Sequence, residues 1–496
     1  MINLSSFIDF HASRTPERLA IVFNEARITY ATLASRVATT AGWLKEHGIG
    51  EGDVVAVLMK NSAAFVEIAI AVGHIGAVFL PINFRLSADE VGYIVENAGA
   101  KLLIADEELA DSAALGGAVI LLDSVGQSDS TRLGPEAAPA ARVPRKPGDL
   151  FRLMYTSGTT DRPKGVMHSY ENFYWKCSDH IVALGLNAES RLLVTGPLYH
   201  VGAFDLPGLA VLWVGGMLCI IRDFSAETAL AAIAREELDS AWLAPVMTSA
   251  MLATAPTSGL DLTSLRWVIG GGERTPEARI RSFCESFPRA RYIDAYGLTE
   301  TCSGDTLMEA GREIEKIGSV GRALAHVEIE IRDEQGRALP AGETGEICLR
   351  GPKITLGYWN DPAKTEAAFY DDWFRSGDMG YLDRDGFLFL TDRLKDMIIS
   401  GGENIASSEV ERVIFELPQV REVAVIGAPD ERWGEKPVAF VVLEPGEELS
   451  LEALRSHCRT KLAAFKAPRD IVIRESLPRN PSGKILKRLL REEFRS

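Results

Sequence analysis

The segment that runs from Tyr155 to Val166 carries residue types that suit the binding of a polyphosphate. It contains two glycines, four Ser/Thr hydroxyls and a lysine, and it follows the apolar run Leu150–Met154, which we predict to be a strand. A loop at a strand end can offer backbone N–H groups, hydroxyl donors and a cation to phosphate oxygens. The Gly-x-x-x-x-Gly-Lys-Ser/Thr pattern of a Walker loop is absent from it, so a different kind of phosphate loop is indicated. A polar surface turn is the simpler alternative, because Ser/Thr/Gly-rich loops are common.

A second segment, Tyr296-Gly-Leu-Thr-Glu-Thr301, combines a flat aromatic ring, hydroxyls and one carboxylate. These groups suit adenine stacking, phosphate contact and Mg²⁺ ligation. Mg²⁺ needs few protein carboxylates when phosphate oxygens complete its shell, so Glu300 alone would suffice. By itself, however, such a stretch is more often an ordinary strand-to-loop turn.

Three further segments each contain a residue or turn that suits nucleotide or thiol chemistry. Trp373-Phe-Arg-Ser-Gly-Asp378 places an aspartate at a glycine turn, where its carboxylate can accept hydrogen bonds from two ribose hydroxyls. The segment 392–404 contains Ser-Gly-Gly, and successive glycines allow a ligand close to the backbone. Arg479-Asn-Pro-Ser-Gly-Lys484 presents a lysine on a Pro/Gly turn near the C-terminus. Each feature alone is also typical of a solvent-facing turn.

The five segments, in this order and at these separations, resemble the motifs of the adenylate-forming superfamily. That superfamily holds acyl-CoA synthetases, peptide-synthetase adenylation domains and beetle luciferases. The resemblance covers essentially the whole chain, and it is closest to bacterial fatty and other carboxylic acid–CoA ligases. It implies an α/β fold with a large N-terminal adenylate-forming domain, which includes a β-subdomain, and a small mobile C-terminal α+β domain.

The resemblance implies an acid–thiol ligase that works in two steps. A carboxylate would attack the α-phosphate of ATP to give acyl-AMP and pyrophosphate, and the thiol of CoA would then attack the acyl carbonyl. The implied cofactors are ATP, Mg²⁺ and CoA, and the implied substrate is a small carboxylic acid, apolar and fatty or ring-bearing. The alternative is an adenylating enzyme that serves a carrier-protein thiol or a nitrogen nucleophile. A Gly-x-Asp-Ser-Leu carrier attachment site does not occur in the sequence, which favours the CoA ligase.

The resemblance also implies roles for individual residues. The catalytic residues would be Lys484, which would stabilise charge that develops during adenylation, the Mg²⁺ ligand Glu300, Thr156, and His200 near the acyl site. A lone histidine is more often structural, whereas the family match favours gating or carboxylate placement, so both interpretations of His200 stay open. CoA would contact Ser400, Gly401, Gly402, Arg432 and Trp433 after rotation of the C-terminal domain about the hinge residue Lys395. ATP would contact Thr156, Ser157, Gly158, Thr159, Thr160, Lys164, Gly271, Gly272, Tyr296, Gly297, Thr301, Asp378 and Arg393.

A non-catalytic nucleotide-binding protein or a luciferase-like protein is a rival from another class. The joint presence of Lys484, Glu300 and Asp378 argues against a dead adenylation site. Asp205 is a candidate for binding the ammonium group of an amino-acid substrate, but a structural role is the more frequent one. The apolar candidates for the acyl pocket, which are equally typical of plain core, are Trp213, Trp242, Met247 and Met251.

Three departures from the family pattern concern the ligand sites. Asp161 stands where the phosphate loop usually has glycine, and its carboxylate would repel a triphosphate, so we expect it to point outward or to pair with Arg162. The segments 270–276 and 405–409 also differ from the common pattern. We therefore expect a reshaped adenine wall and acyl floor, and altered local contacts in the thioester-forming conformation.

Alternating helical and strand patterns in the N-terminal part are typical of α/β layers. Helices are predicted from a Thr29 cap to Gly48, at 62–75 and, with a Ser87/Glu90 capping box, at 87–97. Strands are predicted at 53–59, 78–82 and 101–105, a buried strand region at 211–221, and a β-subdomain from the runs 327–332 and 346–350. A C-terminal unit follows, with helices at 407–417 and 451–462 and strands at 420–427 and 437–444. The predicted division is an N-terminal ATP- and acyl-binding domain at 1–392, a hinge at 393–395 and a lid domain at 396–496.

Composition limits the class of protein further. The chain has 496 residues, 46% apolar residues and a formal charge of −16, which argues against nucleic-acid binding and against strong attraction to anionic membranes. Membrane association is therefore expected to be peripheral at most. The six cysteines are far apart, as in reduced cytoplasmic proteins, and no signal-peptide pattern is present. We predict a cytoplasmic enzyme, and the oligomeric state stays open, a homodimer included.

Overall fold

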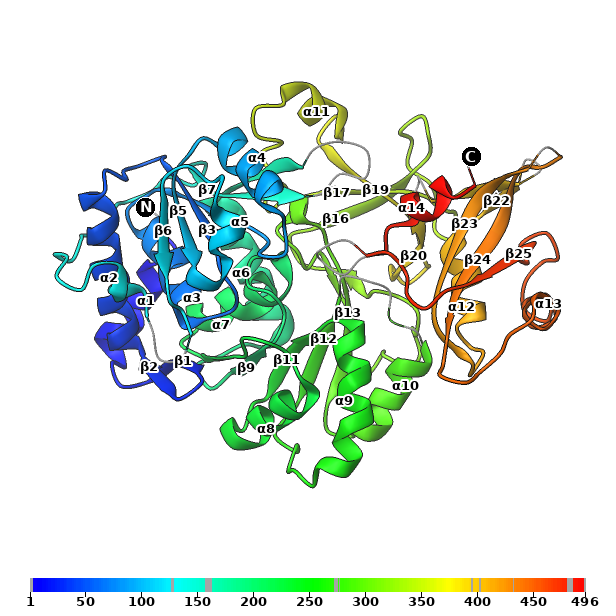
Figure 1. Cartoon of the computed structure of the whole chain (residues 1–496), viewed down its shortest axis with the longest axis horizontal. Helices are drawn as coiled ribbons and strands as arrows, with labels where there is room; N and C mark the ends of the chain where they lie inside the picture. The colour runs from blue at the N-terminus through cyan, green and yellow to red at the C-terminus, as the bar shows by residue number, and fades with distance from the viewer. Residues whose placement is uncertain are drawn as a thin grey trace. The chain divides into compact units, whose positions relative to one another are not determined.

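The computed structural model describes residues 3–125, 129–156, 163–271, 275, 277–393, 396–400, 403–430, 432–479 and 485–494. The chain divides into two compact units (Figure 1). The first unit is Met1–Thr275, Arg279–Glu328 and Arg350–Phe374, and the second is Pro276–Ala278, Ile329–Leu349 and Arg375–Ser496. Helices and strands alternate through the first unit, and an α+β arrangement ends the second. The predicted α/β fold class is confirmed.

Two mostly parallel sheets form the frame of the first unit, and antiparallel pairs occur only toward their edges among the described strands. Parallel neighbours require crossover connections, which explains the alternation of helix and strand in the sequence. The larger sheet has the order β15 (Arg322–Ala323), β14 (Thr306–Leu307), β13 (Arg291–Tyr296), β12 (Trp267–Gly270), β11 (Ser240–Leu243), β9 (Arg191–Val194), β10 (Met217–Ile220), β1 (Leu19–Phe23), β2 (Ala26–Thr29). The smaller sheet has the order β6 (Val119–Leu122), β5 (Ala100–Asp106), β3 (Val54–Leu58), β4 (Val78–Pro81), β7 (Leu150–Thr156), β8 (Lys164–Ser169).

The helices of the N-terminal half begin where the sequence predicts. Thr29 caps α2 by accepting a hydrogen bond from the Thr32 N–H at 3.2 Å. The Ser87/Glu90 capping box of α4 is present. Every residue of α3 (Ala63–His74) is buried, as expected of a mostly apolar helix, and the buried Glu67 pairs with Arg36. The other helices outside the C-terminal region are α1 (Ser6–Arg14), α2 (Tyr30–Glu46), α4 (Ala88–Ala98), α5 (Ala110–Ala113), α6 (Tyr170–Leu184), α7 (Leu209–Trp213), α8 (Ala226–Glu236), α9 (Pro245–Ser258), α10 (Glu277–Ser286) and α11 (Pro362–Ala367).

The prediction of one buried strand region at 211–221 is wrong in its first part. The structure places helix α7 there, followed by a turn and then by β10. The turn contains Gly215 with φ +89°, a conformation that favours glycine and interrupts the apolar run. A short apolar run has no period that separates a buried helix from a buried strand, which is why the sequence alone misled.

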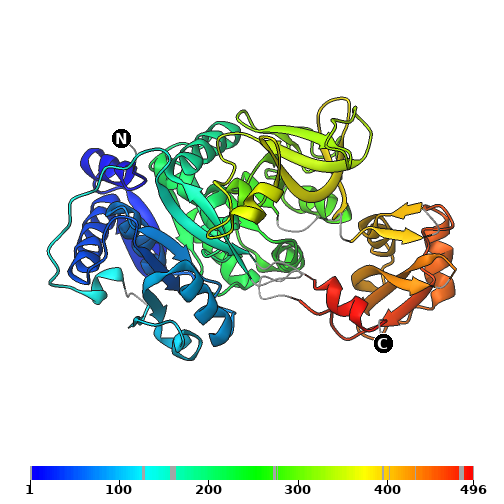
Figure 2. The ribbon, with the colours of Figure 1, turned by 90° about the horizontal axis from the view of Figure 1, so that it is seen from above.

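Two further sheets lie in the rest of the chain. The first contains the predicted β-subdomain strands and has the order β16 (Glu328–Arg332), β17 (Gly345–Arg350), β19 (Trp373–Leu382), β18 (Phe369–Tyr370), with β20 (Leu388–Arg393) pairing with β19. The C-terminal sheet, drawn in orange in Figure 2, has the order β22 (Glu403–Ile405), β21 (Ile398–Ser400), β24 (Gly434–Leu443), β23 (Val420–Asp430), with β25 (Asp470–Ile473) pairing with β24. Its helices are α12 (Ser407–Ile414), α13 (Leu451–Arg459) and α14 (Lys487–Glu492).

The C-terminal sheet is covered on both faces, and the alternation along β23 shows it. Val425 packs in one apolar cluster with Val410 of α12 and Leu454 of α13. Its neighbour Ile426 packs in a second cluster with Leu490 of α14. Successive side chains of a strand point to opposite faces, so the two clusters are separate small cores.

Candidate active site

The predicted phosphate loop closes a β-hairpin. Strands β7 and β8 are antiparallel, and Thr156 lies opposite Lys164 in the last pair of the ladder before the loop. The residues between them include the predicted ATP ligands Ser157, Gly158, Thr159 and Thr160, and also Asp161. All five lie outside the described residues. The hairpin therefore positions Thr156 and Lys164 as the two described ends of the loop.

The segment 355–359 lies beside β8 and also contacts the Thr-Glu-Thr segment through its backbone. The Trp359 N–H donates to the Gly165 carbonyl at 2.7 Å, and the Met167 N–H donates to the Gly357 carbonyl at 3.0 Å. The Thr355 N–H donates to the Glu300 carbonyl at 2.7 Å. These backbone bonds bring segments that are distant in the sequence to one place.

Lys164, Glu300 and Tyr358 meet at this place. Lys164 Nζ lies 4.0 Å from Glu300 Oε1 and 4.0 Å from the centre of the Tyr358 ring. The Tyr358 hydroxyl donates to Glu300 Oε1 at 3.0 Å. Burial raises the pKa of Tyr358, and Glu300 raises it further, so the phenol stays protonated and remains a donor. A cation suited to phosphate and a carboxylate suited to Mg²⁺ are thus adjacent.

Tyr358 is a site residue that sequence reasoning missed. It follows Gly357 in an apolar stretch, and nothing in its local spacing links it to the Thr-Glu-Thr segment. Its sequence separation from Glu300 is 58 residues. Only the pairing of its segment with β8 shows the contact.

The turn after β13 folds back sharply on itself. A Cβ atom at Gly297 would lie 2.3 Å from the backbone nitrogen of Gly304, so only glycine fits there. Tyr296, at the end of β13, is 7% exposed. Thr301 is fully buried, and its hydroxyl donates to Asp305 and accepts from the Leu298 N–H at 3.1 Å. A contact between Thr301 and phosphate would require the hydroxyl to leave these partners.

The glycines after β12 differ in the space around them. A Cβ at Gly270 would lie 1.8 Å from the Tyr292 hydroxyl, whereas a Cβ at Gly271 would meet nothing within 3.7 Å among the described residues. The space beside Gly271 is bordered by Ala295 and Trp242 Nε1, which is compatible with a flat ligand next to the backbone. Gly272 lies outside the described residues.

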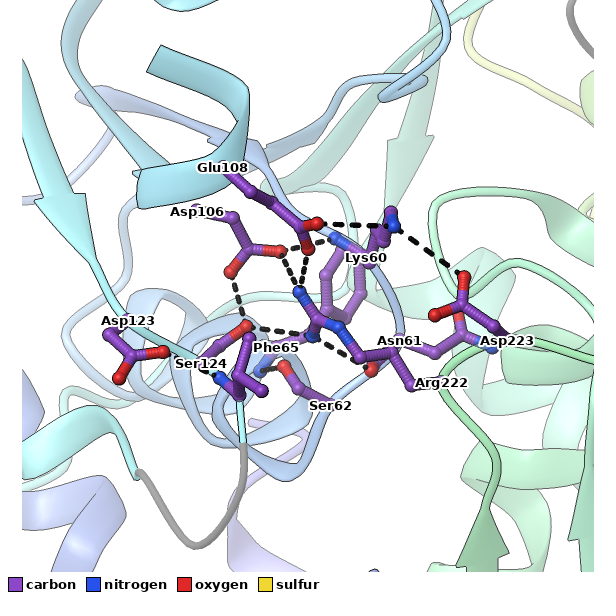
Figure 3. A network of polar contacts seen from close by, with 11 residues as sticks. Lys60, Asn61, Ser62, Phe65, Asp106, Glu108, Asp123, Ser124, Arg222 and Asp223 are labelled. Atoms are coloured by element: carbon purple, nitrogen blue, oxygen red, sulfur yellow. Dashed lines mark hydrogen bonds and ion pairs between the residues drawn. The ribbon is translucent and has the colours of Figure 1, made fainter.

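The segment that carries His200 is held by Asn61, which is 3% exposed. Figure 3 shows Asn61 next to Arg222 in a network of polar contacts. The Asn61 amide donates to the carbonyls of Gly196 at 2.9 Å and Ile221 at 3.1 Å, and its Oδ1 accepts from the Leu198 N–H at 2.8 Å. Arg222 contacts the same corner through Asp106 at 3.0 Å and through the Asn61 carbonyl at 3.4 Å.

His200 directly precedes the π-helical segment Val201–Gly208. Its Nδ1 accepts from the Gly202 N–H at 3.3 Å. Trp242 packs directly on this segment, because a Cβ at Gly196 or Gly202 would lie 2.5 or 2.7 Å from its ring. The indole therefore packs on the backbone on both sides of His200 in the sequence.

The other candidates for the acyl pocket belong to the packing of the core. Trp213 stacks on Phe7 at 5.4 Å, and Met251 is 1% exposed within the apolar cluster of the larger sheet. Met247 packs against the same cluster. Asp205 is fully buried and forms an ion pair with Arg152 at 2.7 Å, which agrees with its structural interpretation.

In the second unit, two predicted ribose ligands are opposite each other on adjacent strands. Asp378 of β19 is the cross-strand partner of Arg393 of β20. The Asp378 N–H donates to Ser376 Oγ at 3.0 Å, next to Gly377 with φ +70°. The sequence predicts a tight turn at Gly377, but β19 continues through it as a strand with one left-handed residue.

Three of the predicted CoA residues, Ser400, Arg432 and Trp433, lie close together in one part of the C-terminal sheet. Ser400 pairs with Gly434, directly after Arg432 and Trp433. Asp430 Oδ1 accepts from the N–H groups of both residues, at 3.0 and 3.1 Å, and the Arg432 guanidinium lies 4.7 Å from the Trp433 ring centre. The predicted residues Gly401, Gly402, Lys395 and Lys484 lie outside the described residues.

Comparison with known proteins agrees with this fold and site. The model of the AMP-binding enzyme family matches residues 8–359, and that of the AMP-binding enzyme C-terminal domain matches residues 409–484. A feruloyl-CoA synthase from an Amycolatopsis species is 36% identical over 97% of each chain. A long-chain-fatty-acid–CoA ligase from Mycobacterium tuberculosis is 36% identical over 100% of this chain and 99% of its own.

A solved structure extends the comparison to three dimensions. The o-succinylbenzoate CoA synthetase from Bacillus subtilis, in complex with its acyl-adenylate intermediate, matches with a TM-score of 0.89 and 31% identity over 99% of this chain and 98% of that chain. The same enzyme has been solved with ATP and a magnesium ion.

The chain belongs to the AMP-binding enzyme family, which lies within the adenylate-forming superfamily. Its class at the level of the family is that of AMP-forming acid–CoA ligases. The predicted family and enzyme class, and the predicted use of ATP, Mg²⁺ and CoA, are confirmed at this level. None of the helices in the described ranges has the length and apolar character needed to cross a membrane.

Proposed function

We propose that this protein activates an apolar fatty or ring-bearing carboxylic acid as its acyl-AMP and then transfers the acyl group to CoA. The proposal rests on the distance of 4.0 Å between Lys164 Nζ and Glu300 Oε1. Lys164 lies at the end of the β7–β8 hairpin where the phosphate loop is attached. The substrate class is supported by the named acids of the relatives, which are feruloyl, long-chain fatty and succinylbenzoyl groups.

In the proposed adenylation step the hairpin holds the β- and γ-phosphates through Thr156, the loop residues and Lys164. Among the described residues only one oxygen of Glu300, Oε1, has a hydrogen-bond or ion-pair partner, so its carboxylate fits a Mg²⁺ ligand. Bound Mg²⁺ would neutralise part of the phosphate charge. Tyr296 and the space beside Gly271 receive the adenine, and Asp378 with Arg393 holds the ribose.

The proposed chemistry moves one acyl group between two acceptors. The carboxylate oxygen of the acid forms a bond to the α-phosphorus of ATP, and pyrophosphate leaves with its electron pair. The CoA thiolate then adds to the acyl carbonyl, and AMP leaves. Lys484 acts in the first step, and Ser400, the two glycines after it, Arg432 and Trp433 act in the second. Between the two steps the proposed lid domain, 396–496, rotates about Lys395.

The acyl site is proposed to lie next to His200 and Trp242. Three glycines, Gly196, Gly202 and Gly271, border the indole of Trp242. Trp242 is 7% exposed. An apolar wall excludes water from a reactive acyl-AMP, which favours apolar acids over small charged ones.

The test is a pyrophosphate-release screen of fatty, aryl and amino acids with ATP and Mg²⁺, with and without CoA. We expect turnover with fatty or aryl acids that depends on CoA and yields a thioester. Release that ignores CoA would instead identify an enzyme that supplies an adenylate to another thiol or to a nitrogen nucleophile. Turnover only with amino acids would contradict the proposed substrate class.

A further inference from the structure

Arg152, which is among the largest fully buried side chains of the described residues, lies on β7 four positions before Thr156. Its guanidinium forms two parallel hydrogen bonds with Asp205, at 2.9 and 2.7 Å. Both side chains are 1% exposed or less. Arg152 and Lys176, whose Nζ lies 3.8 Å from Asp205, together outweigh burial and hold the pKa of Asp205 below its usual value, so the pair is ionised. Burying two charges is costly unless geometry and further hydrogen bonds compensate.

The same guanidinium continues to His168 on β8. Its Nε and Nη2 lie 3.2 and 3.1 Å from His168 Nδ1, and an arginine can only donate. Nδ1 is therefore the acceptor nitrogen, and Nε2 carries the proton. Nε2 donates to the Thr299 carbonyl at 2.6 Å. Burial lowers the pKa of His168 to about 3, so this neutral tautomer persists near neutral pH.

The chain of contacts joins the three segments to which the proposed function assigns the reaction. Asp205 lies in the π-helical segment that begins after His200, near the acyl site. Arg152 and His168 lie on the two strands that carry the phosphate loop. Thr299 is the residue before Glu300. The chain from Asp205 through Arg152 and His168 to Thr299 thus runs from the acyl side to the metal side of the site.

The turn at the end of this chain is held against conformational strain. Cys302, Ser303 and Gly304 have φ values of 57°, 70° and 67°, and such left-handed backbone costs about 1 kcal/mol or more at each non-glycine residue. Lys353, fully buried, donates to the Gly304 carbonyl at 2.5 Å and lies 3.2 Å from Asp305. A turn that is strained and clamped at both ends is held in one geometry by its surroundings.

We propose that Arg152, Asp205 and His168 are positioning residues that hold the acyl segment, the phosphate-loop strands and the Glu300 turn in one fixed arrangement. This inference rests on the proposed function and adds residues that touch no substrate. Reacting groups displaced by about 1 Å can lose on the order of 10²-fold in rate, while each substrate still binds. The network therefore acts on the rate of adenylation rather than on affinity.

The test replaces the ion pair by apolar residues of similar size, in the double variant Arg152→Met/Asp205→Leu. This replacement also removes the counter-charge of the buried Lys176, which costs stability, so thermal unfolding first confirms that the double variant is folded. We expect the folded double variant to show a kcat for pyrophosphate release about 10²-fold lower, with KM for ATP and for the acid within about 3-fold of the parent.

The matched control is a second ion pair of the same unit, Arg36 and Glu67, at 2.9 Å, whose carboxylate is fully buried. It joins α2 to α3 and contacts none of the three segments. Arg36→Met/Glu67→Leu should change thermal stability and leave kcat within about 3-fold. A kcat near the parent value in Arg152→Met/Asp205→Leu, or an equal loss in both double variants, would overturn the proposal.

His168 gives a test that does not depend on the folding of the double variant. In His168→Gln the side-chain amide can still donate to the Thr299 carbonyl, whereas in His168→Leu it cannot. We expect the kcat of His168→Gln to be at least ten-fold higher than that of His168→Leu. Equal kcat values in the two variants would overturn the proposal. A parent that releases no pyrophosphate with any acid would contradict the proposed function, and this inference would fail with it. An active parent with unaffected variants contradicts the positioning role alone.

Discussion

At the scale of single residues, the site depends on opposite charges that lie next to each other. Glu300 faces the cation of Lys164 and accepts from the Tyr358 hydroxyl. A carboxylate in such a place is partly neutralised by protein groups and can exchange them for Mg²⁺ and phosphate.

Replacing this carboxylate tests the proposed metal role. Glu300→Gln should lower kcat/KM for acid-dependent pyrophosphate release by about 10²–10³-fold and shift its Mg²⁺ dependence to higher concentration, because the amide has no charge for the metal. The measurement is the release rate across a Mg²⁺ titration. Tyr358→Phe is the control, since it removes only one hydrogen bond, worth about 1 kcal/mol. An unchanged Mg²⁺ dependence in Glu300→Gln would refute the assignment.

His168 predicts how stability depends on pH. An unfolded histidine titrates near 6.5, whereas burial lowers the pKa of His168 to about 3 in the folded protein. The unfolded state thus binds a proton that the folded state excludes, and stability is lost as pH falls below about 6.5. By linkage this loss is about 2 kcal/mol between pH 7 and pH 5.

Thermal unfolding at pH 7, 6 and 5 checks this sign. His168→Gln should show a smaller fall in Tm toward pH 5 than the parent does. His47→Gln, at the exposed C-terminal end of α2, controls for the loss of a histidine as such. A parallel fall in parent and His168→Gln would show that this imidazole does not carry the effect.

At the scale of elements, hairpins place several of the proposed nucleotide-binding residues. The β7–β8 hairpin sets Thr156 opposite Lys164, and the pairing of β19 with β20 sets Asp378 opposite Arg393. Cross-strand neighbours lie about 5 Å apart at Cα, so both side chains of such a pair can contact the same ligand group. Register, rather than sequence distance, brings each pair together.

The β19–β20 pair gives a prediction about the sugar. If Asp378 accepts from the ribose hydroxyls, Asp378→Ala should raise KM for ATP about ten-fold or more and reduce the preference for ATP over 2′-deoxy-ATP. The measurement compares kcat/KM for the two nucleotides in both proteins. Asp383→Ala, which alters the turn between the same two strands, is the control. A preference that persists unchanged in Asp378→Ala would remove this residue from the ribose site.

At the scale of the whole molecule, two different sets of residues are proposed to serve acyl-AMP formation and acyl transfer to CoA. Lys484→Ala should abolish acyl-AMP formation, while preformed acyl-AMP still reacts with CoA. Trp433→Ala should show the opposite pattern, because it removes a proposed CoA contact and leaves the phosphate hairpin intact. The measurements are acid-dependent pyrophosphate release and thioester formation from synthetic acyl-AMP. Loss of both half-reactions in either variant would contradict the division.

Local sequence determined the elements, and with them the resemblance to a family. The helix caps at Thr29 and Ser87 and the apolar helix after Ser62 follow from side-chain types a few residues apart. The phosphate segment, the Thr-Glu-Thr segment and the C-terminal lysine turn are likewise contiguous. Interactions within a few residues depend little on the rest of the fold, so a sequence displays them directly.

Tertiary structure alone decided which distant residues share a site. Tyr358 meets Glu300, Arg152 meets Asp205 and His168 meets Thr299 across 58, 53 and 131 residues. Whether 211–221 is a helix and a strand or one strand also depended on its surroundings. Such contacts are set by strand order and register, which arise from the burial of whole faces at once. A single sequence specifies them only through the complete fold.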